Sequence, residues 1–387
     1  MVFKTYKMND MKGKQGMVCM GLLLVLSSCH TGKQITASGL QRKDFQTEVN
    51  GQHTDLFTLS NKQGMEVCIT NYGARVVSIL VPDRNGKRED VVCGFSTITE
   101  YMEQRQNFGS TVGRYIGRIL NARFTLDGVE YKLVPNNGKS GHISHGGNPG
   151  FADRMWKVEQ ADTHRVRLSY LSPDGENGFP GNLKVTLVYS LGEDDNALDL
   201  TYEATTDAPT VLNLSHHSFF NISGNFTKSV EDQQLWVDAD RFTPYDDKKC
   251  VTGEYLQVAG TPLDFRMPHA IGECIDADHP QLKVVNGYDH TWELNTKGDD
   301  TRPAAWVYDP ASGRKMEIFT TEPGMQIYTG NGLKGKMTGK GGIAYPFRSA
   351  VCFETMHFQD SPNQPGFPST VLRPGEVFRS HTVYKFE

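Results

Sequence analysis

The sequence lacks the short motifs that mark phosphate, zinc and serine-hydrolase chemistry. It has no Walker phosphate loop and no GxSxG elbow, and the zinc-binding spacings HExxH and HxH do not occur. Side chains that can bind a metal are present but not at a ligand-like spacing, namely His145, His217, Asp289 and Glu354. We therefore expect an activity that needs no cofactor and no metal ion.

An excess of basic charge and a long helical periodicity are also missing. Lys and Arg number 40 against 45 Asp and Glu, which gives a formal net charge of −5. This balance argues against a nucleic-acid partner, which a basic patch would attract. No long stretch repeats apolar side chains every 3.6 positions, and the best helical candidate is the short segment 96–105.

What the sequence does contain is a series of short alternations of apolar and polar residues. They predict strands at residues 65–81, 123–133, 165–171, 183–191, 197–205, 210–222, 234–238, 289–294, 314–321 and 325–329. Asp127-Gly128 between two such runs predicts a two-residue hairpin. This pattern is typical of an all-β sandwich or barrel, and no break in composition divides residues 51–387, so we expect one domain there.

The start of the chain has the features of an export signal. A mostly apolar run at residues 17–26, too short to span a bilayer comfortably, follows four basic residues, Lys4, Lys7, Lys12 and Lys14. Leu26-Ser27-Ser28-Cys29 then resembles a bacterial lipobox, which implies cleavage before Cys29 and attachment of lipid to it. An ordinary signal with an incidental cysteine is the alternative.

We accordingly expect a signal peptide at residues 1–28 and a polar linker at residues 29–50. The protein would be exported and anchored, facing the periplasm or on the outer membrane, with the lipid as its only membrane contact. Five cysteines follow Cys29, and their spacing matches no zinc pattern. Cys68, Cys93 and Cys352 lie in apolar runs typical of buried thiols, while a Cys250–Cys274 disulfide stays open.

Several polar clusters interrupt the apolar runs. They are GRYIGRI at 113–119, HISHGG at 142–147, NLSHHSFFN at 213–221, GYDHTW at 287–292, PGMQIYTGN at 323–331 and CFET at 352–355. His216 and His217 are adjacent, so on a strand their side chains point to opposite faces and only one can face a given pocket. His217 would share its side with Asn213, Ser215 and Phe219.

These clusters, in this order, resemble the aldose 1-epimerase (galactose mutarotase) family over residues 71–384. Further stretches that carry the resemblance are NYGARVVSILVPDRNGKREDVVCGF, ARFTLDGVEYKL, SPDGENGFPGNL, TPLDFR and SPNQPGFPSTVLRPGE. The resemblance implies a large antiparallel β-sandwich of the galactose mutarotase type, with a cleft across one sheet. It also implies conversion between the α and β anomers of a free aldohexose such as glucose or galactose.

The resemblance assigns roles to particular residues. It implies that Glu354 removes the proton of the anomeric hydroxyl and that His217 protonates the ring oxygen. A carboxylate and an imidazole suit this reaction, because one proton must leave as another arrives. The implied ligands of the sugar hydroxyls are Arg118, His145, Asp289 and Gln326.

Three positions depart from the family pattern. The Asn that often precedes the second arginine is Gly117, the Leu before His-Gly-Gly is Ser144, and the Gln after Glu-Thr is Met356. Because the implied Glu and His are present, the departures affect the expected sugar preference more than the reaction. The loss at Gly117 implies a sugar contact that is missing or supplied elsewhere.

Two other classes of function fit parts of the pattern, a binding protein and a related carbohydrate enzyme. A non-catalytic sugar-binding lipoprotein on the same fold would explain Gly117. A hexose-phosphate epimerase would need clustered arginines beyond Arg114 and Arg118, and a glycosidase would need two carboxylates, for which Asp289 and Glu354 are the candidates. With an aldohexose as its partner, we expect the protein to act as a monomer or weak dimer.

Overall fold

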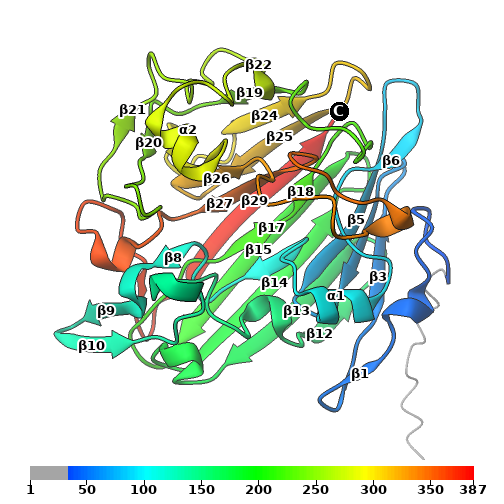
Figure 1. Cartoon of the computed structure of the whole chain (residues 1–387). Coiled ribbons are helices and arrows are strands. Elements are labelled where there is room, and N and C mark those ends of the chain that lie inside the picture. Colours follow the sequence, from blue (N-terminus) through cyan, green and yellow to red (C-terminus); the bar gives the residue numbers. More distant parts are fainter. Residues whose placement is uncertain (1–33) are drawn as a thin grey trace, which may run out of the picture. The chain divides into compact units, whose positions relative to one another are not determined.

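A computed structural model of the protein describes residues 34–387, and its largest sheet has nine strands (Figure 1). The expected signal peptide and Cys29 lie outside the described residues. In spatial order the sheet contains β12 (Lys157–Ala161), β13 (Arg165–Ser172), β14 (Leu183–Leu191), β15 (Ala197–Thr206), β29 (Phe378–Phe386), β25 (Lys315–Thr320), β24 (Ala305–Tyr308), β19 (Gln234–Val237) and β22 (His269–Ala270).

A six-stranded sheet and a four-stranded sheet complete the main framework. The six strands are β18 (Phe219–Phe220), β27 (Val351–Met356), β26 (Gly324–Tyr328), β23 (Asp289–Glu293), β20 (Arg241–Thr243) and β21 (Leu256–Gln257). The four are β3 (Leu56–Ser60), β4 (Glu66–Thr70), β5 (Arg75–Pro82) and β6 (Arg88–Asp90).

The remaining strands form two-stranded ladders. They are β1 (Glu48–Val49) with β2 (Gln52–His53), β9 (Arg123–Leu126) with β10 (Val129–Lys132), β8 (Arg118–Ile119) with β11 (Ile143–Ser144), β7 (Ser110–Val112) with β17 (Ser215–His217), and β16 (Thr210–Val211) with β28 (Val371–Leu372). Every ladder between named strands of residues 34–387 is antiparallel, which confirms the predicted all-β class.

Helices within the described residues are short. The two α-helices are α1 (Ile98–Gln104), inside the predicted segment 96–105, and α2 (Pro280–Val285). Thr97 and Glu100 form a capping box that fixes the start of α1. The 3-10 turns are η1 (Arg42–Phe45), η2 (Leu120–Ala122), η3 (Gly138–Ser140), η4 (Phe151–Asp153), η5 (Glu176–Gly178), η6 (Ile271–Glu273), η7 (Lys340–Gly342) and η8 (Ser361–Asn363).

The hydrophobic core lies between the large sheets. Strand β14 alternates apolar side chains such as Val185 and Leu187, which face inward and pack with Phe353 of the six-stranded sheet in one cluster. A hydrogen bond also joins the nine-stranded and six-stranded sheets, because the Tyr384 hydroxyl donates to the backbone oxygen of Phe353 at 2.9 Å. One face of the six-stranded sheet therefore packs against the core.

The predicted hairpin at Asp127-Gly128 is confirmed. Leu126 pairs with Val129, and both turn residues have positive φ, 50° for Asp127 and 79° for Gly128. Such angles fit the two-residue turns whose twist matches that of paired strands.

A GxGxxG spacing also occurs, at residues 330–335, but turns follow it instead of the helix that a dinucleotide site requires.

Part of the expected linker is folded onto the domain. Within residues 34–50, Leu40 and Phe45 are buried in a cluster with Leu56, and Arg42 pairs with Asp55 through Nε at 2.7 Å. Leu40 and Phe45 lie in a segment rich in polar residues, so their burial was not predicted from the sequence. Among residues 34–387, no helix is both long and apolar enough to cross a membrane.

Candidate active site

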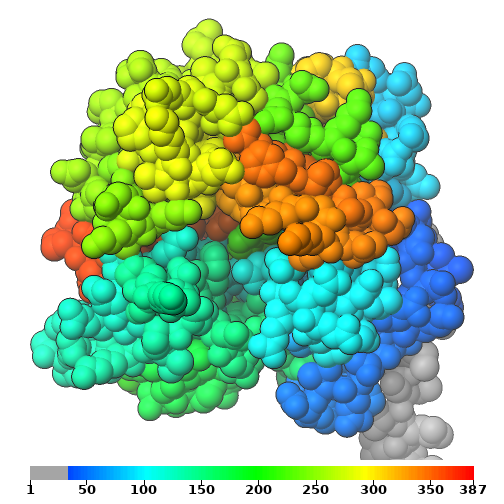
Figure 2. Space-filling view, in the orientation of Figure 1, coloured from blue at the N-terminus to red at the C-terminus, as the bar shows by residue number. Residues whose placement is uncertain are grey.

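A polar pocket of about 250 Å³ opens on the face of the six-stranded sheet that the core leaves free. This volume is close to the lower end of small-molecule pockets, about 300–1,000 Å³, and suits a single sugar ring better than a polymer. The surface is hollowed between the cyan and teal segments and the yellow and orange ones (Figure 2). All six site residues expected from the sequence line the pocket, namely Arg118, His145, His217, Asp289, Gln326 and Glu354.

Strand register explains how three of these residues meet. Glu354 on β27 lies directly opposite Gln326 on β26, which in turn lies opposite Thr291 on β23. Asp289 is two residues before Thr291 and therefore shares its face. The pocket floor is thus a row of polar side chains across three adjacent strands, with the apolar residues between them directed at the core.

The two adjacent histidines separate as strand geometry predicts. His217, at the end of β17, lines the pocket. His216 points into the core, where its Nε2 lies 2.6 Å from the Ser218 hydroxyl, and burial lowers its pKa to about 3. The alternation therefore selects His217 as the histidine that can act in the pocket.

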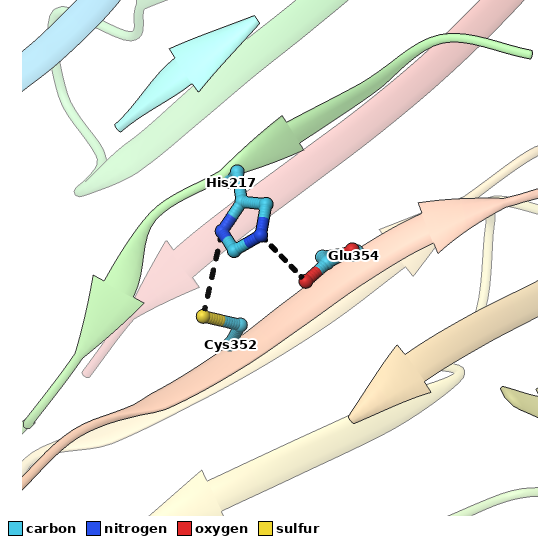
Figure 3. A group of neighbouring side chains, drawn as sticks. All are labelled: His217, Cys352 and Glu354. Carbon is cyan, nitrogen blue, oxygen red and sulfur yellow. Dashed lines mark hydrogen bonds and ion pairs between the residues drawn. The ribbon is translucent and has the colours of Figure 1, made fainter. Parts of the chain in front are cut away.

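His217 and Glu354 are in direct contact. Nε2 of His217 lies 3.2 Å from Oε1 of Glu354, and its Nδ1 lies 3.6 Å from Sγ of Cys352. Cys352 and Glu354 are two residues apart on β27, so both side chains point to the imidazole, one at each ring nitrogen (Figure 3). Ring stacking on Phe219, with centroids 5.1 Å apart, fixes the plane of the imidazole.

Burial dominates the electrostatics of this pair. The side chains of His217 and Glu354 are 7% and 5% exposed. Burial, reinforced by the nearby His145, holds the pKa of His217 well below its usual value. Burial, reinforced by Asp289 and opposed by Arg118, holds the pKa of Glu354 well above its usual value. Both shifts favour a pair with no net charge, in which one proton is shared between carboxylate and imidazole.

A ladder at the pocket wall places Arg118 and His145 together. Ser144 on β11 pairs with Arg118 on β8, and the backbone N–H of His145 donates to the oxygen of Gly117 at 2.9 Å. Burial next to Arg118 lowers the pKa of His145 to about 4, so its imidazole is neutral at pH 7. Gly146 is required here, because a Cβ would lie 1.9 Å from the oxygen of Gly113.

The amide of Gln326 is held from both sides. Its Nε2 donates to Oδ1 of Asp289 at 2.6 Å, and its Oε1 accepts from the Thr291 hydroxyl at 2.5 Å. Burial raises the pKa of Asp289, against the opposing effects of Arg118 and of the bond from Gln326. The free lone pairs of Asp289 and the second N–H of Gln326 can then meet hydroxyl groups in the pocket.

The pocket also contains residues that the sequence did not single out. They are Gln106, Asn107, Tyr328 and Gln359. Tyr328 is two residues after Gln326 on β26 and shares its face, so the alternation could have predicted its place in the pocket. Cys352 and Glu354 on β27 are related in the same way. Gln359 lies in a loop after β27, where no periodicity predicts a direction. Trp292, in the polar cluster at 287–292, is fully buried in the core.

Within residues 34–387, one group of side chains comes close enough together to bind a metal, and it is His217, Cys352 and Glu354. The two contacts of His217 use different ring nitrogens on opposite sides of the imidazole (Figure 3). A metal ion would use only one of these nitrogens, whereas here both ring nitrogens of His217 are engaged by side chains. The arrangement fits a hydrogen-bonded acid–base pair better than a metal centre.

Comparison with known proteins accounts for most of the described residues. The aldose 1-epimerase family matches residues 55–385. The chain belongs to the aldose 1-epimerase family. It is 40% identical to galactose mutarotase of Bos taurus, over 85% of this chain and 93% of that protein. It is 36% identical to aldose 1-epimerase of Escherichia coli K12, over 87% and 96% of the two chains.

Solved structures agree with the sequence comparison. The aldose epimerase homologue of C. elegans superposes with a TM-score of 0.79 at 31% identity, covering 86% of this chain and 99% of its own. The expected antiparallel β-sandwich of the aldose 1-epimerase family is therefore confirmed. As an aldose 1-epimerase family member, the chain has a described domain that spans nearly the full length of its relatives.

All three departures from the family pattern lie in the pocket wall, whereas Arg114 does not. Met356 and Ser144 both line the pocket, as does Gly117. Arg114 is buried elsewhere, where its Nε donates to Ser172 at 2.9 Å and its Nη1 to the oxygen of Pro180 at 2.8 Å. Among the described residues, Arg118 is the arginine of this pocket, which leaves no arginine cluster for a sugar phosphate.

Proposed function

We propose that the protein is an aldose 1-epimerase that interconverts the α and β anomers of a free aldohexose. The observation that carries the proposal is the contact of 3.2 Å between His217 Nε2 and Glu354 Oε1 at the floor of a polar pocket. Mutarotation needs one group to accept a proton from the C1 hydroxyl and another to donate one to the ring oxygen, the two oxygens bonded to C1. The two side chains supply these functions within the span of one sugar.

The reaction then proceeds by ring opening and reclosure. Glu354, as the carboxylate, takes the proton of the C1 hydroxyl while the protonated His217 delivers its proton to the ring oxygen. The bond between C1 and the ring oxygen breaks and C1 becomes an aldehyde carbon. Rotation about the C1–C2 bond presents the other carbonyl face, and the reverse proton transfers close the ring as the opposite anomer.

A single shared proton makes this pair suitable in both directions. Carboxylic acid with neutral imidazole, and carboxylate with imidazolium, contain the same number of protons, so the pair always has one acid and one base. A second proton removes the base, and loss of the shared proton removes the acid. Activity should therefore rise and fall with pH around the singly protonated state.

Sugar hydroxyls would be held by the remaining polar side chains. Arg118 and Gln326 donate, Asp289 accepts, and the neutral imidazole of His145 can do either. Oε1 of Gln326 already accepts from Thr291 and Gln359, so only its N–H is free. His145 Nδ1 is buried without a hydrogen-bond partner among the described residues. We also propose that the protein acts as a monomer or weak dimer.

The proposal is tested by polarimetry on freshly dissolved α-D-glucose or α-D-galactose. Glu354→Gln and His217→Asn should each lower kcat/KM by about 10² to 10⁴-fold, the usual contribution of a positioned proton transfer. Both variants should keep the fold, because each replacement is similar in size. His164→Asn, in a turn outside the pocket, is the matched control. Rates near wild type in either pocket variant would refute the assignment.

We also propose that the mature protein is an exported lipoprotein anchored through Cys29, with residues 51–387 as its catalytic domain. The support is the order of basic residues, apolar run and small residues before Cys29. Labelled fatty acid should enter the wild-type protein and be absent from Cys29→Ser. An exported, soluble and unlabelled wild-type protein would instead indicate an ordinary signal peptide.

A further inference from the structure

The side chain of Gln359 fills the space that a side chain at Gly117 would need. Gly117 has φ of +74°, and a Cβ built on it would lie 2.5 Å from Cγ and 3.1 Å from Cδ of Gln359. Gln359 is 4% exposed and lines the sugar pocket. An amide group therefore lies in this part of the pocket wall. It belongs to Gln359, in the loop after β27, and not to residue 117.

Its hydrogen bonds fix which way the Gln359 amide points. The backbone N–H of Arg118 lies 3.3 Å from Oε1, and because an N–H can only donate, the oxygen must face it. Nε2 then faces the Tyr245 hydroxyl at 2.7 Å and Oε1 of Gln326 at 3.3 Å. All three polar contacts of Gln359 are thus to protein groups.

The orientation of the Gln359 amide determines that of the neighbouring Gln326 amide in the pocket wall. Because Gln359 donates to Oε1 of Gln326, the Gln326 amide must present its Nε2 to Asp289, as it does at 2.6 Å. Gln359 therefore connects the backbone of Arg118 with Gln326 and, through it, with Asp289. These are three of the four groups that would hold the sugar hydroxyls.

We propose that Gln359 is a positioning residue for the sugar site, and that it takes over the place left open by Gly117. The inference rests on the proposed function, since it concerns the same pocket. Gln359 aligns the binding groups and takes no part in the proton transfers of Glu354 and His217. Its loss should therefore raise KM and leave kcat nearly unchanged.

A kinetic cycle between positions 117 and 359 tests the inference. Gln359→Ala should raise KM about 5- to 20-fold, the effect of losing a buried hydrogen-bond connection, with kcat within about threefold of wild type. Gly117→Asn alone should be impaired more, because its Cβ meets Gln359. The double variant Gly117→Asn/Gln359→Ala should recover a KM within about threefold of wild type, since Asn tolerates positive φ and returns an amide to the wall.

A nearly isosteric variant separates positioning from packing. Gln359→Glu keeps the volume and the acceptor for Arg118, but faces Oε1 of Gln326 with a second acceptor, so KM should rise about tenfold. The matched control is Gln233→Ala, a glutamine equally buried outside the pocket, which should lower stability and leave KM unchanged.

The outcomes separate the two levels of the argument. Unchanged KM in both Gln359→Ala and Gln359→Glu, or a double variant no better than the poorer single variant, would overturn the role of Gln359 while the wild type stays active. A wild type that neither accelerates mutarotation nor gains thermal stability from galactose would instead remove the proposed function itself.

Discussion

Two histidines lie against carboxylates of the two large sheets, and they behave in opposite ways. His217, in the pocket of the six-stranded sheet, is buried, and its pKa is held well below the usual value. His381, on β29 of the nine-stranded sheet, is 32% exposed and lies 2.6 Å from both Asp199 and Asp300. Hydrogen bonds to these aspartates outweigh its partial burial and raise its pKa to about 9.

The difference shows what distinguishes a catalytic pair from a structural ion pair. Near the surface, water stabilises the charges and two carboxylates fix the proton on the imidazole. In the pocket, burial disfavours the charged form of each partner, so the pair is held with no net charge, as carboxylic acid and neutral imidazole. The pocket pair cannot gain or lose a proton without burying a charge, whereas His381 keeps its charge near the surface, and the following predictions test this contrast.

The largest effect is expected from combining the two pocket substitutions. Because Glu354 and His217 act as one unit, the double variant Glu354→Gln/His217→Asn should be within about threefold of the slower single variant. Independent contributions would instead multiply, making the double variant slower by a further factor of about 10² or more. Single and double variants should be compared by polarimetry at the same enzyme concentration.

An intermediate effect is expected at Cys352. Burial holds its thiol neutral by raising its pKa well above the usual value, and Sγ contacts Nδ1 of His217 at 3.6 Å. Cys352→Ala removes the contact between Sγ and the imidazole of His217 and should lower kcat/KM about three- to tenfold. Cys93→Ala, which removes an equally buried free thiol outside the pocket, should leave kcat/KM unchanged. Equal activity in both variants would remove any role for Cys352.

The smallest effect is expected at His381, and it concerns stability alone. A folded pKa of about 9 exceeds the unfolded value of about 6.5, so the stabilisation is fully present below pH 6.5 and is lost as pH rises through about 9. Allowing for exposure, His381→Gln should lower the free energy of unfolding by about 1 kcal/mol at pH 6. Near pH 10 the two proteins should be equally stable in urea titrations, and kcat/KM should match throughout.

The same contrast explains how far the sequence predicts the structure. Strands β14 and β15 are buried on one side, so their alternation identified them correctly, and the same rule separated His217 from His216. Strand β27 is buried on both faces, so burial alone does not show which of its residues face the pocket. The roles of Glu354 and Asp289 came from the family resemblance.

Other features could not be predicted because no local pattern encodes them. Gln359 reaches the pocket from a loop and meets Gly117, which is far away in the sequence, so only the folded chain reveals the exchange. Leu40 and Phe45 are isolated apolar residues in a polar segment, and their burial depends on a surface formed by other strands. The thiols of Cys250 and Cys274 are free, with Cys250 Sγ 3.2 Å from Nε2 of His142.

The central claim is tested most directly by a crystal structure of the Glu354→Gln variant with galactose bound. The account predicts one pyranose ring in the pocket, with its C1 hydroxyl about 2.6–3.2 Å from residue 354 and its ring oxygen at a similar distance from Nε2 of His217. A sugar whose C1 points away from these two side chains, or which binds outside the pocket, would contradict it.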